Sequence, residues 1–175
     1  MQYKSIFSGT KAWFAVACCC CIIACSSTRS LKQDKGWISL FDGKTFNGWK
    51  AGENPGTFTI EDGSIKVAGV RSHLYYDGSV MNHDFTNFEF KALVMTKPGS
   101  NSGIYFHTAF QEKGFPDKGF EVQVNNSHTD WKRSGGLYDI KDTREVYVKD
   151  DVWYTEYIRL ISSHIYMQED IIVTL

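Results

Sequence analysis

The chain has 175 residues with a formal net charge of −1 at pH 7, and 42% of its residues are hydrophobic and 15% aromatic. This apolar content is ample for one packed domain and excludes a disordered chain. Because the chain has no basic excess to hold a phosphate backbone, we expect no nucleic acid partner.

The first 24 residues have the shape of an export signal. Lys4 and Lys11 precede the apolar run AWFAVACCCCIIA, which is too short to span a bilayer as a helix. We therefore expect residues 1–24 to be a signal peptide with a helical apolar stretch. All five cysteines lie between positions 18 and 25. The rest of the chain therefore contains no disulfide and no cysteine nucleophile.

The end of this signal carries a processing motif. The segment IIAC, which ends at Cys25 and is followed by SSTRS, resembles the bacterial lipobox, in which cleavage precedes a cysteine that is then lipidated. We expect lipidation at Cys25, a polar tether through residue 35, and a lipid-anchored location on the outer membrane of the bacterial cell envelope. One alternative is ordinary cleavage after Cys25; another, weaker, is processing at the segment AVAC, which ends at Cys18.

From residue 36 onward the pattern is that of β-strands. Apolar residues alternate on either side of Asp62-Gly63, the dipeptide that most favours a tight turn, and predict a hairpin over residues 57–67. Residues 88–95 alternate in the same way. Further strands are expected in ISLFD, HLYY, NSGIYFHT, FEVQVN, GGLYD and VWYTEYIRL. Short strands between turn residues, with no sustained helical period, predict an all-β fold, an antiparallel two-sheet β-sandwich of the jelly-roll type.

The strand FEVQVN contains a row of polar residues. Its apolar residues are expected to face the core, which places Glu121, Gln123 and Asn125 on the opposite face. If NSGIYFHT pairs with this strand, Tyr105 and His107 lie about 5 Å from the row. Sugars bind to such mixtures of polar groups and rings. The alternative is a solvated polar face without function, which antiparallel sheets commonly have.

Two familiar kinds of site are not indicated. A conventional glycosidase needs two carboxylates about 5 to 9.5 Å apart, but Glu121 is followed two residues later by Gln123. The remaining histidines lack metal-ligand spacing and are expected on the surface or in loops. They are His73, His83, His128 and His164. The sequence thus indicates no metal site and no cofactor.

Four stretches occur in order along the chain: LFDGKTFNGWK, NSGIYFHT, GFEVQVNN and SGGLYD. Together they resemble the 3-keto-disaccharide hydrolase family, formerly a domain of unknown function, over residues 36 to 160. The resemblance implies a concanavalin-like or glucanase-like jelly roll, export as a lipoprotein, and a hydrolase or lyase that cleaves glycosides with a ketone at C3. It implies an oxidised di- or oligosaccharide or glycoside as partner, beside the membrane that holds the anchor.

A ketone at C3 acidifies the C2 proton, so that one general base can remove it and the C1 substituent can leave by elimination. Glu121 matches the family's glutamate in the Glu-Val-Gln strand, which implies a base or a carboxylate that orients the substrate. His107 is the competing base, since a histidine titrates near pH ~6.5. Many relatives have Arg at this position, so both proton transfer and binding stay open for His107.

The resemblance also implies residues that bind the sugar. Hydrogen bonds to hydroxyls or to the enolate are expected from the polar row and its neighbour, and a loop is expected to close over the ring. These residues are Asn101, Gln123, Asn125, Lys132, Arg133 and Tyr138. Two other functions stay open: a glycan-binding lipoprotein without catalysis, and a structural or interaction lipoprotein.

The C-terminal segment departs from the family pattern. Relatives continue past WYTEYIRL with a further hairpin, whereas this chain runs SSHIYMQEDIIVTL. We expect residues 36–175 to be one jelly-roll domain whose C-terminal strands are missing. The open sheet edge and uncovered apolar surface that would result predict low stability.

Overall fold

The computed structural model describes residues 1–5, 36–161 and 164–170, and the side chains of residue 5 and of residues 164–170 lie outside this description. The described chain is almost entirely strands and loops. The strands are β1 (Gln2–Ser5), β2 (Ile38–Ser39), β3 (Trp49–Ala51), β4 (Phe58–Glu61), β5 (Ser64–Val67), β6 (Leu74–Tyr76), β7 (Phe88–Val94), β8 (Ser102–Phe106), β9 (Phe120–Val124), β10 (Tyr154–Ile161) and β11 (His164–Asp170). Two short 3-10 turns, η1 (Pro55–Thr57) and η2 (Val80–His83), complete them.

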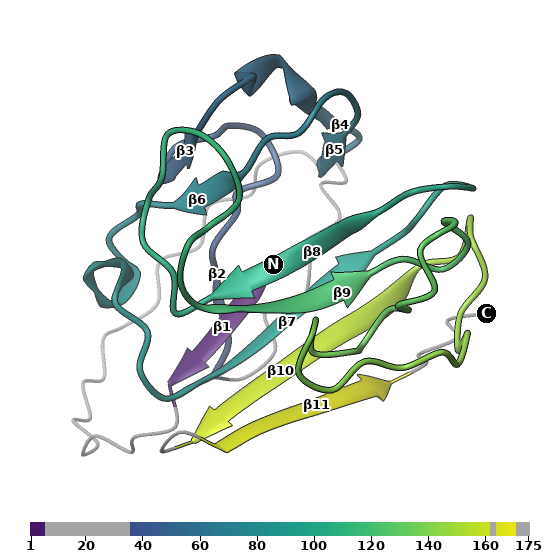
Figure 1. The fold of residues 1–175 in the computed structure, drawn as a ribbon. Coiled ribbons are helices and arrows are strands. Elements are labelled where there is room, and N and C mark those ends of the chain that lie inside the picture. Colours follow the sequence, from purple (N-terminus) through teal and green to yellow (C-terminus); the bar gives the residue numbers. More distant parts are fainter. Residues whose placement is uncertain (6–35, 162–163, 171–175) are drawn as a thin grey trace, which may run out of the picture.

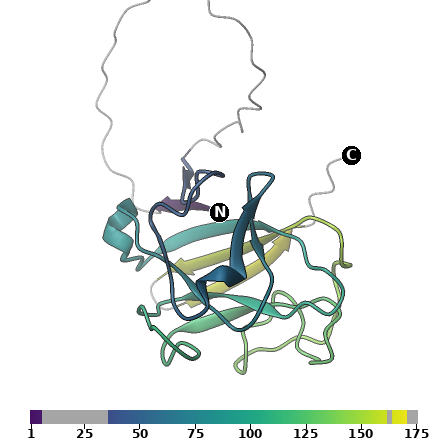
Figure 2. The same ribbon diagram turned by 90° about the horizontal axis from the view of Figure 1, so that it is seen from above.

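The strands of the described part of the chain pair only in antiparallel fashion. A large sheet has the order β11–β10–β7–β1–β2, and three pairs, β3–β6, β4–β5 and β8–β9, accompany it. Figure 1 shows β8–β9 in front of the large sheet, with β3–β6 and β4–β5 above them. Seen from above in Figure 2, β8–β9 and the large sheet are separate layers. The predicted all-β antiparallel sandwich is confirmed.

The core lies between these two layers. Phe88 of β7 and Ile158 of β10 belong to the same buried cluster as Phe106 of β8 and Val122 of β9. The rings of Phe88 and Phe106 meet edge to face with centroids 5.9 Å apart. Burial of such side chains stabilises a fold by about 1.5 to 3 kcal/mol each. Because this packing fixes which face of β8–β9 points inward, it also fixes which residues lie on the opposite face.

The predicted hairpin over residues 57–67 is confirmed. Strands β4 and β5 pair from Phe58↔Val67 to Glu61↔Ser64. Asp62 and Gly63 between them have φ of 49° and 76°. Two successive left-handed residues form the turn whose twist matches that of a hairpin, which is why Asp-Gly occurs there.

The segment GGLYD was expected to be a strand, but it makes only isolated β-bridges. Leu137 makes isolated bridges to Val122 and to Lys141. The chain reverses directly afterwards, since the amide of Lys141 donates back to the carbonyl oxygen of Leu137 at 2.8 Å and Asp139 has a left-handed φ of 57°. The segment is therefore a turn that covers the outer edge of β9.

Strand β1 lies within the stretch predicted to be the export signal. It pairs with β7 on one side and β2 on the other. Tyr3 is 2% exposed, and its ring centroid lies 4.8 Å from that of Phe85. The rest of the predicted signal and tether, residues 6–35 with Cys25, lies outside the described residues. In the described residues no helix has the length and apolarity needed to cross a bilayer.

Residues 164–170, which lie in the segment expected to depart from the family pattern, also form a strand. Strand β11 pairs with β10 from Thr155↔Asp170 to Ile161↔His164. It occupies one edge of the large sheet and β2 occupies the other (Figure 1).

The burial of Tyr3 predicts that β1 contributes to stability. In the 175-residue chain, Tyr3→Ala is expected to lower the free energy of unfolding by about 3 kcal/mol, because it leaves a cavity beside Phe85. Urea unfolding followed by tryptophan fluorescence measures it. Lys4→Ala is the matched control, because its 3.6 Å ion pair with Glu89 is partly exposed and worth less than about 1 kcal/mol. Equal, small effects of both changes would show that β1 is not part of the folded sheet.

Candidate active site

The face of β8–β9 that is turned away from the core is named the site face. It carries a carboxyl group that is hydrogen-bonded to a tyrosine hydroxyl. Tyr105 of β8 stands opposite Glu121 of β9 in the antiparallel register. Because side chains alternate along a strand and Phe106 and Val122 are buried in the core, Tyr105 and Glu121 share the other face. The Tyr105 hydroxyl donates a hydrogen bond of 2.6 Å to Oε2 of Glu121.

The surroundings shift the pKa of both groups. Burial raises the pKa of Glu121 above its ordinary value, against the opposing effects of the Tyr105 hydrogen bond and the Lys132 charge. Burial, followed by the bond to Glu121, raises the pKa of Tyr105 far above its ordinary value. Tyr105 therefore stays a neutral donor, and Glu121 is a stronger base than a solvated carboxylate, as general-base catalysis near neutral pH requires.

Gly103 provides the space that Glu121 occupies. A Cβ at this position would lie 2.6 Å from Cγ of Glu121 and closer still to its Oε1. Gly103 stands opposite Gln123, two residue pairs along the ladder from Tyr105 and Glu121 and therefore on the same face, so the Glu121 side chain lies across the glycine. The space for the Glu121 side chain thus depends on the absence of a side chain at Gly103 and not on a positive φ there.

Lys132 supplies a positive charge to the site face. Its side chain is 11% exposed, forms an ion pair with Asp139, and lies 3.8 Å from Asp142. Its Nζ is 3.6 Å from the centroid of the Tyr138 ring. The hydrogen bond to Asp139 raises the pKa of Lys132, with a further contribution from Asp142. Lys132 is therefore a fixed ammonium group whose charge reaches Glu121.

Gln123 and Asn101 are joined on the same face. The Gln123 side chain is 1% exposed, and its Nε2 donates a 2.7 Å hydrogen bond to Oδ1 of Asn101, which is exposed. Gln123 is buried because the segment before Leu137 lies alongside it. The backbone N–H of Gln123 donates a hydrogen bond to the carbonyl oxygen of Gly136 at 2.9 Å. Gln123 therefore orients Asn101, which is the member of this pair that a ligand can reach.

Asn125 and Arg133 serve the loop that follows β9. Asn125 is fully buried, and its Nδ2 donates to the carbonyl oxygens of Asp130 and Lys132 at 3.1 and 2.7 Å. Its Oδ1 accepts from the His128 amide and from Nη1 of Arg133. Both were expected to bind substrate, but the structure places their polar groups inside the loop and not on the site face.

His107 is not brought to Glu121. It follows the last residue of β8 with a left-handed φ of 54°, so the strand alternation that predicted its direction ends there. Its Nε2 is 3.0 Å from the carbonyl oxygen of Phe85, and its ring lies 6.2 Å from Phe88 and 5.8 Å from Phe106. His107 lies beside the aromatic core, while the charges that act on Glu121 come from Lys132 and Asp139.

Another histidine, expected to be an ordinary loop residue, lies at the site instead. The ring of His73 is 5.7 Å from that of Tyr105, edge to face. Burial is the main reason that the pKa of His73 is lowered, with Arg71 adding to the effect, so the ring is neutral at neutral pH. Sequence reasoning missed His73 because only the packing of the segment before β6 against β8 brings it to Tyr105.

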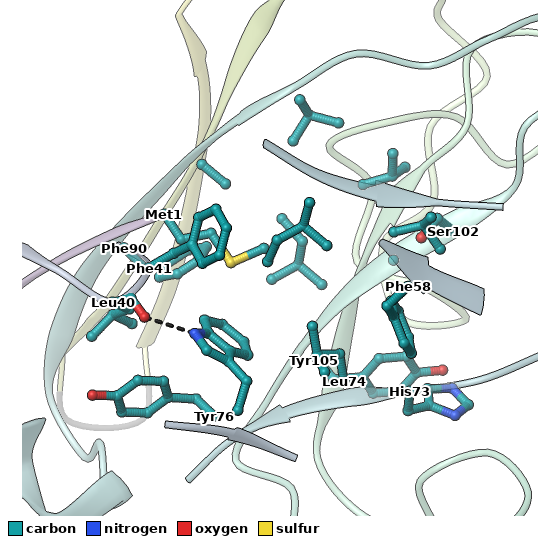
Figure 3. A pocket seen from close by; sticks show the side chains of 18 of the residues that line it. Met1, Leu40, Phe41, Phe58, His73, Leu74, Tyr76, Phe90, Ser102 and Tyr105 are labelled. Carbon is teal, nitrogen blue, oxygen red and sulfur yellow. Dashed lines mark hydrogen bonds between the residues drawn. The ribbon is translucent and has the colours of Figure 1, made fainter. Parts of the chain in front are cut away.

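Tyr105 and His73 border a hollow of about 3930 Å³ that continues between the layers. Figure 3 shows both rings together with Leu74 and Phe58, while Phe90 lies across the hollow among other apolar side chains. Ligand pockets usually measure about 300 to 1,000 Å³. A sugar therefore needs only the end of the hollow that carries Glu121.

Metal ligands do not gather in the described part of the chain, where no three His, Cys, Asp or Glu side chains form a group that could hold an ion. Asp139, whose charge reaches Glu121, and Asp142 both face Lys132. Sequence reasoning missed both acids, because it expected a strand where the chain turns.

Residues 36–174 match the model of a protein family described as the 3-keto-alpha-glucoside-1,2-lyase-like domain. The chain belongs to this family. The match confirms the resemblance seen in the four sequence stretches and places the chain in a hydrolase/lyase family.

A curated member of the family gives a second comparison. A 3-keto-disaccharide hydrolase of Bacteroides thetaiotaomicron is 35% identical to this chain over 133 residues, which cover 60% of this chain and 45% of that protein. The chain therefore spans less than half the length of this relative.

Proposed function

We propose that this chain cleaves the glycosidic bond of 3-keto-glycosides by removing the C2 proton and eliminating the C1 substituent, with Glu121 as the base. The observation that carries this proposal is the Glu121 carboxyl, whose pKa is raised by burial while Tyr105 holds one of its oxygens at 2.6 Å. A base of this kind matches the removal of the C2 proton with which the elimination begins.

The bonds change in two steps. Glu121 takes the proton from C2, and the electron pair of that C–H bond becomes an enolate with its charge on the C3 oxygen. The ketone then re-forms as a C1=C2 double bond appears and the C1–O bond breaks, and the departing oxygen takes the proton from the Glu121 carboxyl, which regenerates the base. Addition of water across C1=C2 gives the free 3-keto sugar in a hydrolase, and its absence leaves the unsaturated sugar of a lyase.

The positive charge of Lys132 is suited to stabilise the negative charge of the enolate. Because the ion pair with Asp139 keeps it an ammonium group, it acts through charge and not as an amine that would form an imine. Fixed charge near a developing oxyanion is commonly the largest single contribution to catalysis. Asn101, oriented by Gln123, is the amide that we assign to a sugar hydroxyl, and Tyr138 is assigned to the ring face beside Lys132.

A two-carboxylate mechanism has less support on this site face. Asp139 is the other acid whose charge reaches Glu121, and it is committed to an ion pair with Lys132. A retaining or inverting glycosidase needs a second carboxyl free to act as acid or base. One base and one cation are sufficient for elimination.

The deciding assay compares a 3-keto-glycoside with its unoxidised parent. We expect aglycone to be released from the oxidised compound alone, since only its C2 proton is acidified. Equal release from both, or release from neither, would refute the proposal. Binding of unoxidised oligosaccharides without turnover, unchanged by Glu121→Gln, would favour a glycan-binding protein instead.

The raised pKa of Glu121 predicts the acid limb of activity. The base must be ionised, so kcat/KM should rise with pH through a pKa above the ordinary value of 4.5. The Tyr105 hydrogen bond lowers the pKa of Glu121, so Tyr105→Phe should move this limb to higher pH. A pH profile of both proteins measures the shift, and an unmoved limb, or one at lower pH, would exclude Glu121 as the titrating group.

We also propose that the protein is exported and held on the bacterial cell envelope through a lipid on Cys25. The support is the segment IIAC with the lysines and apolar run before it. Labelled palmitate should enter the expressed protein and be lost in Cys25→Ala. Equal labelling of both would overturn the assignment.

A further inference from the structure

We propose that His73, Phe110 and Phe115 form a subsite for the leaving group and select aglycones with an aromatic ring. The inference rests on the proposed function, because it needs a glycoside whose C1 lies near Glu121. It adds a specificity to that function: the bond is cleaved preferentially when the group that leaves can stack.

The first support is a continuous line of rings that starts at the catalytic carboxyl. Tyr105 binds Glu121 through its hydroxyl. The ring of His73 meets that of Tyr105 at 5.7 Å, and the ring of Phe115 meets that of His73 at 5.5 Å, both edge to face. A group leaving from a sugar held at Glu121 therefore finds rings along its way out.

The second support is exposure that the packing of the core does not require. Phe115 is 60% exposed and Phe110 is 43% exposed. Single exposed apolar residues are normal on proteins, but here two aromatic rings lie on one loop, and one of them contacts His73. Exposed rings next to polar groups are the usual surface for stacking a flat ligand.

The loop that carries both rings is held by a hydrogen bond within itself, by one to Glu53 and by a ring contact to β6. The Gly114 amide donates to the Glu53 carboxylate at 3.1 Å, and Nε2 of Gln111 donates to the carbonyl oxygen of Phe115 at 2.7 Å. The ring of Phe110 packs on that of Tyr75 of β6 at 5.1 Å. Figure 1 shows this loop between β8 and β9 rising beside β3 and β6. The rings are therefore held in place before a ligand arrives, which lowers the entropy cost of binding.

Positive charge accompanies both rings. Nζ of Lys50 lies 3.6 Å from the centroid of Phe110, and the guanidinium of Arg71 lies 5.0 Å from that of Phe115. Arg71 is paired with Glu53 at 2.8 Å. A cation on an aglycone would meet like charge here, so the subsite should accept neutral or anionic rings and reject cationic ones.

The experiment measures binding without turnover. Glu121→Gln is the background, and calorimetry gives the dissociation constants of the phenyl and methyl 3-keto-glucosides. We expect the phenyl compound to bind about tenfold more tightly, and Phe115→Ala to reduce this preference about fivefold without changing methyl binding, since one ring contact is worth about 0.5 to 1.5 kcal/mol. Tyr147→Ala is the matched control, because Tyr147 is a similarly exposed aromatic residue, at 56%, on another loop. It should leave both constants unchanged.

Each other outcome decides against one of the two ideas. Equal loss for both compounds in Phe115→Ala, no preference in the background protein, or no binding of either compound would overturn the subsite. A trimethylammonio-phenyl 3-keto-glucoside that binds as tightly as the phenyl compound would overturn the role of the cations. Binding that depends on Phe115 in a protein that cleaves no glycoside would leave the subsite standing and refute the proposed function. Turnover with no aglycone preference would support the proposed function and refute the subsite.

Discussion

Glu121→Gln is expected to lower kcat on a 3-keto-glycoside about a thousandfold, because removal of a general base costs typically 10²- to 10⁴-fold. The substitution keeps the length of the side chain and an oxygen that accepts the Tyr105 hydrogen bond of 2.6 Å. It removes the negative charge of the carboxylate and with it the ability to take a proton. Single-turnover release of a chromogenic aglycone measures the loss.

The same substitution should not harm the fold. A carboxyl whose pKa is raised by folding contributes stability below its ordinary pKa and loses that contribution as pH rises through the folded value. Burial raises the pKa of Glu121, so at neutral pH Glu121→Gln should melt at the same or a higher temperature than the parent. The difference should vanish in acid. Glu145→Gln, on an exposed loop residue, is the control, and activity within tenfold of the parent in Glu121→Gln would show that another group is the base.

Gly103→Ala is expected to lower activity about a hundredfold while the protein stays folded. The new methyl carbon would lie 2.6 Å from Cγ of Glu121, and real side chains do not approach so closely. The flexible acid therefore has to swing aside and lose its hydrogen bond to Tyr105. Misplacement of a catalytic group by about 1 Å commonly costs 10²-fold in rate.

Gly99→Ala is the matched contrast. A Cβ at Gly99 would meet nothing within 4 Å, but its φ of 77° is left-handed, so alanine there costs about 1 to 2 kcal/mol of stability. Activity per folded molecule should stay unchanged. Thermal melts beside rate measurements separate the two effects. If Gly103→Ala were as active as Gly99→Ala, the position of the Glu121 carboxyl in this structure would not be required for activity.

Local sequence rules predicted the framework of the site. Strand alternation predicted that Tyr105 and Glu121 share one face. The structure agrees, because the residues that follow them, Phe106 and Val122, are buried in the core. Turn chemistry placed the β4–β5 hairpin at Asp62-Gly63. Such features depend on residues that are neighbours in the sequence, and nothing elsewhere in the fold overrides them.

Contacts between distant segments decided the rest. His73 reaches Tyr105 only because its segment packs beside β8, and no spacing in the sequence encodes this. Asn125 is buried because the loop after β9 folds back on it. His107 turns away because β8 ends one residue before it and His107 itself has a positive φ. Alternation is a rule for strands and does not say where a strand stops.

Strand β1 shows the same limit. Its residues lie in the stretch that the sequence predicts to be an export signal, and no strand was expected there. In the structure they fill the space between β7 and β2, where Tyr3 is buried. Pairing partners supplied by the large sheet, and not the propensity of the segment, explain this strand.

The central claim is that Glu121 removes the hydrogen on C2 of the sugar. The most direct test is a 3-keto-glycoside carrying deuterium at C2, cleaved in ordinary water, with the sugar product analysed by mass spectrometry and with a sample free of enzyme to correct for spontaneous exchange. Elimination predicts that the label is lost from every product molecule, and that Glu121→Gln stops both the loss of label and the release of aglycone. Release of aglycone with the deuterium still on C2 would contradict the account.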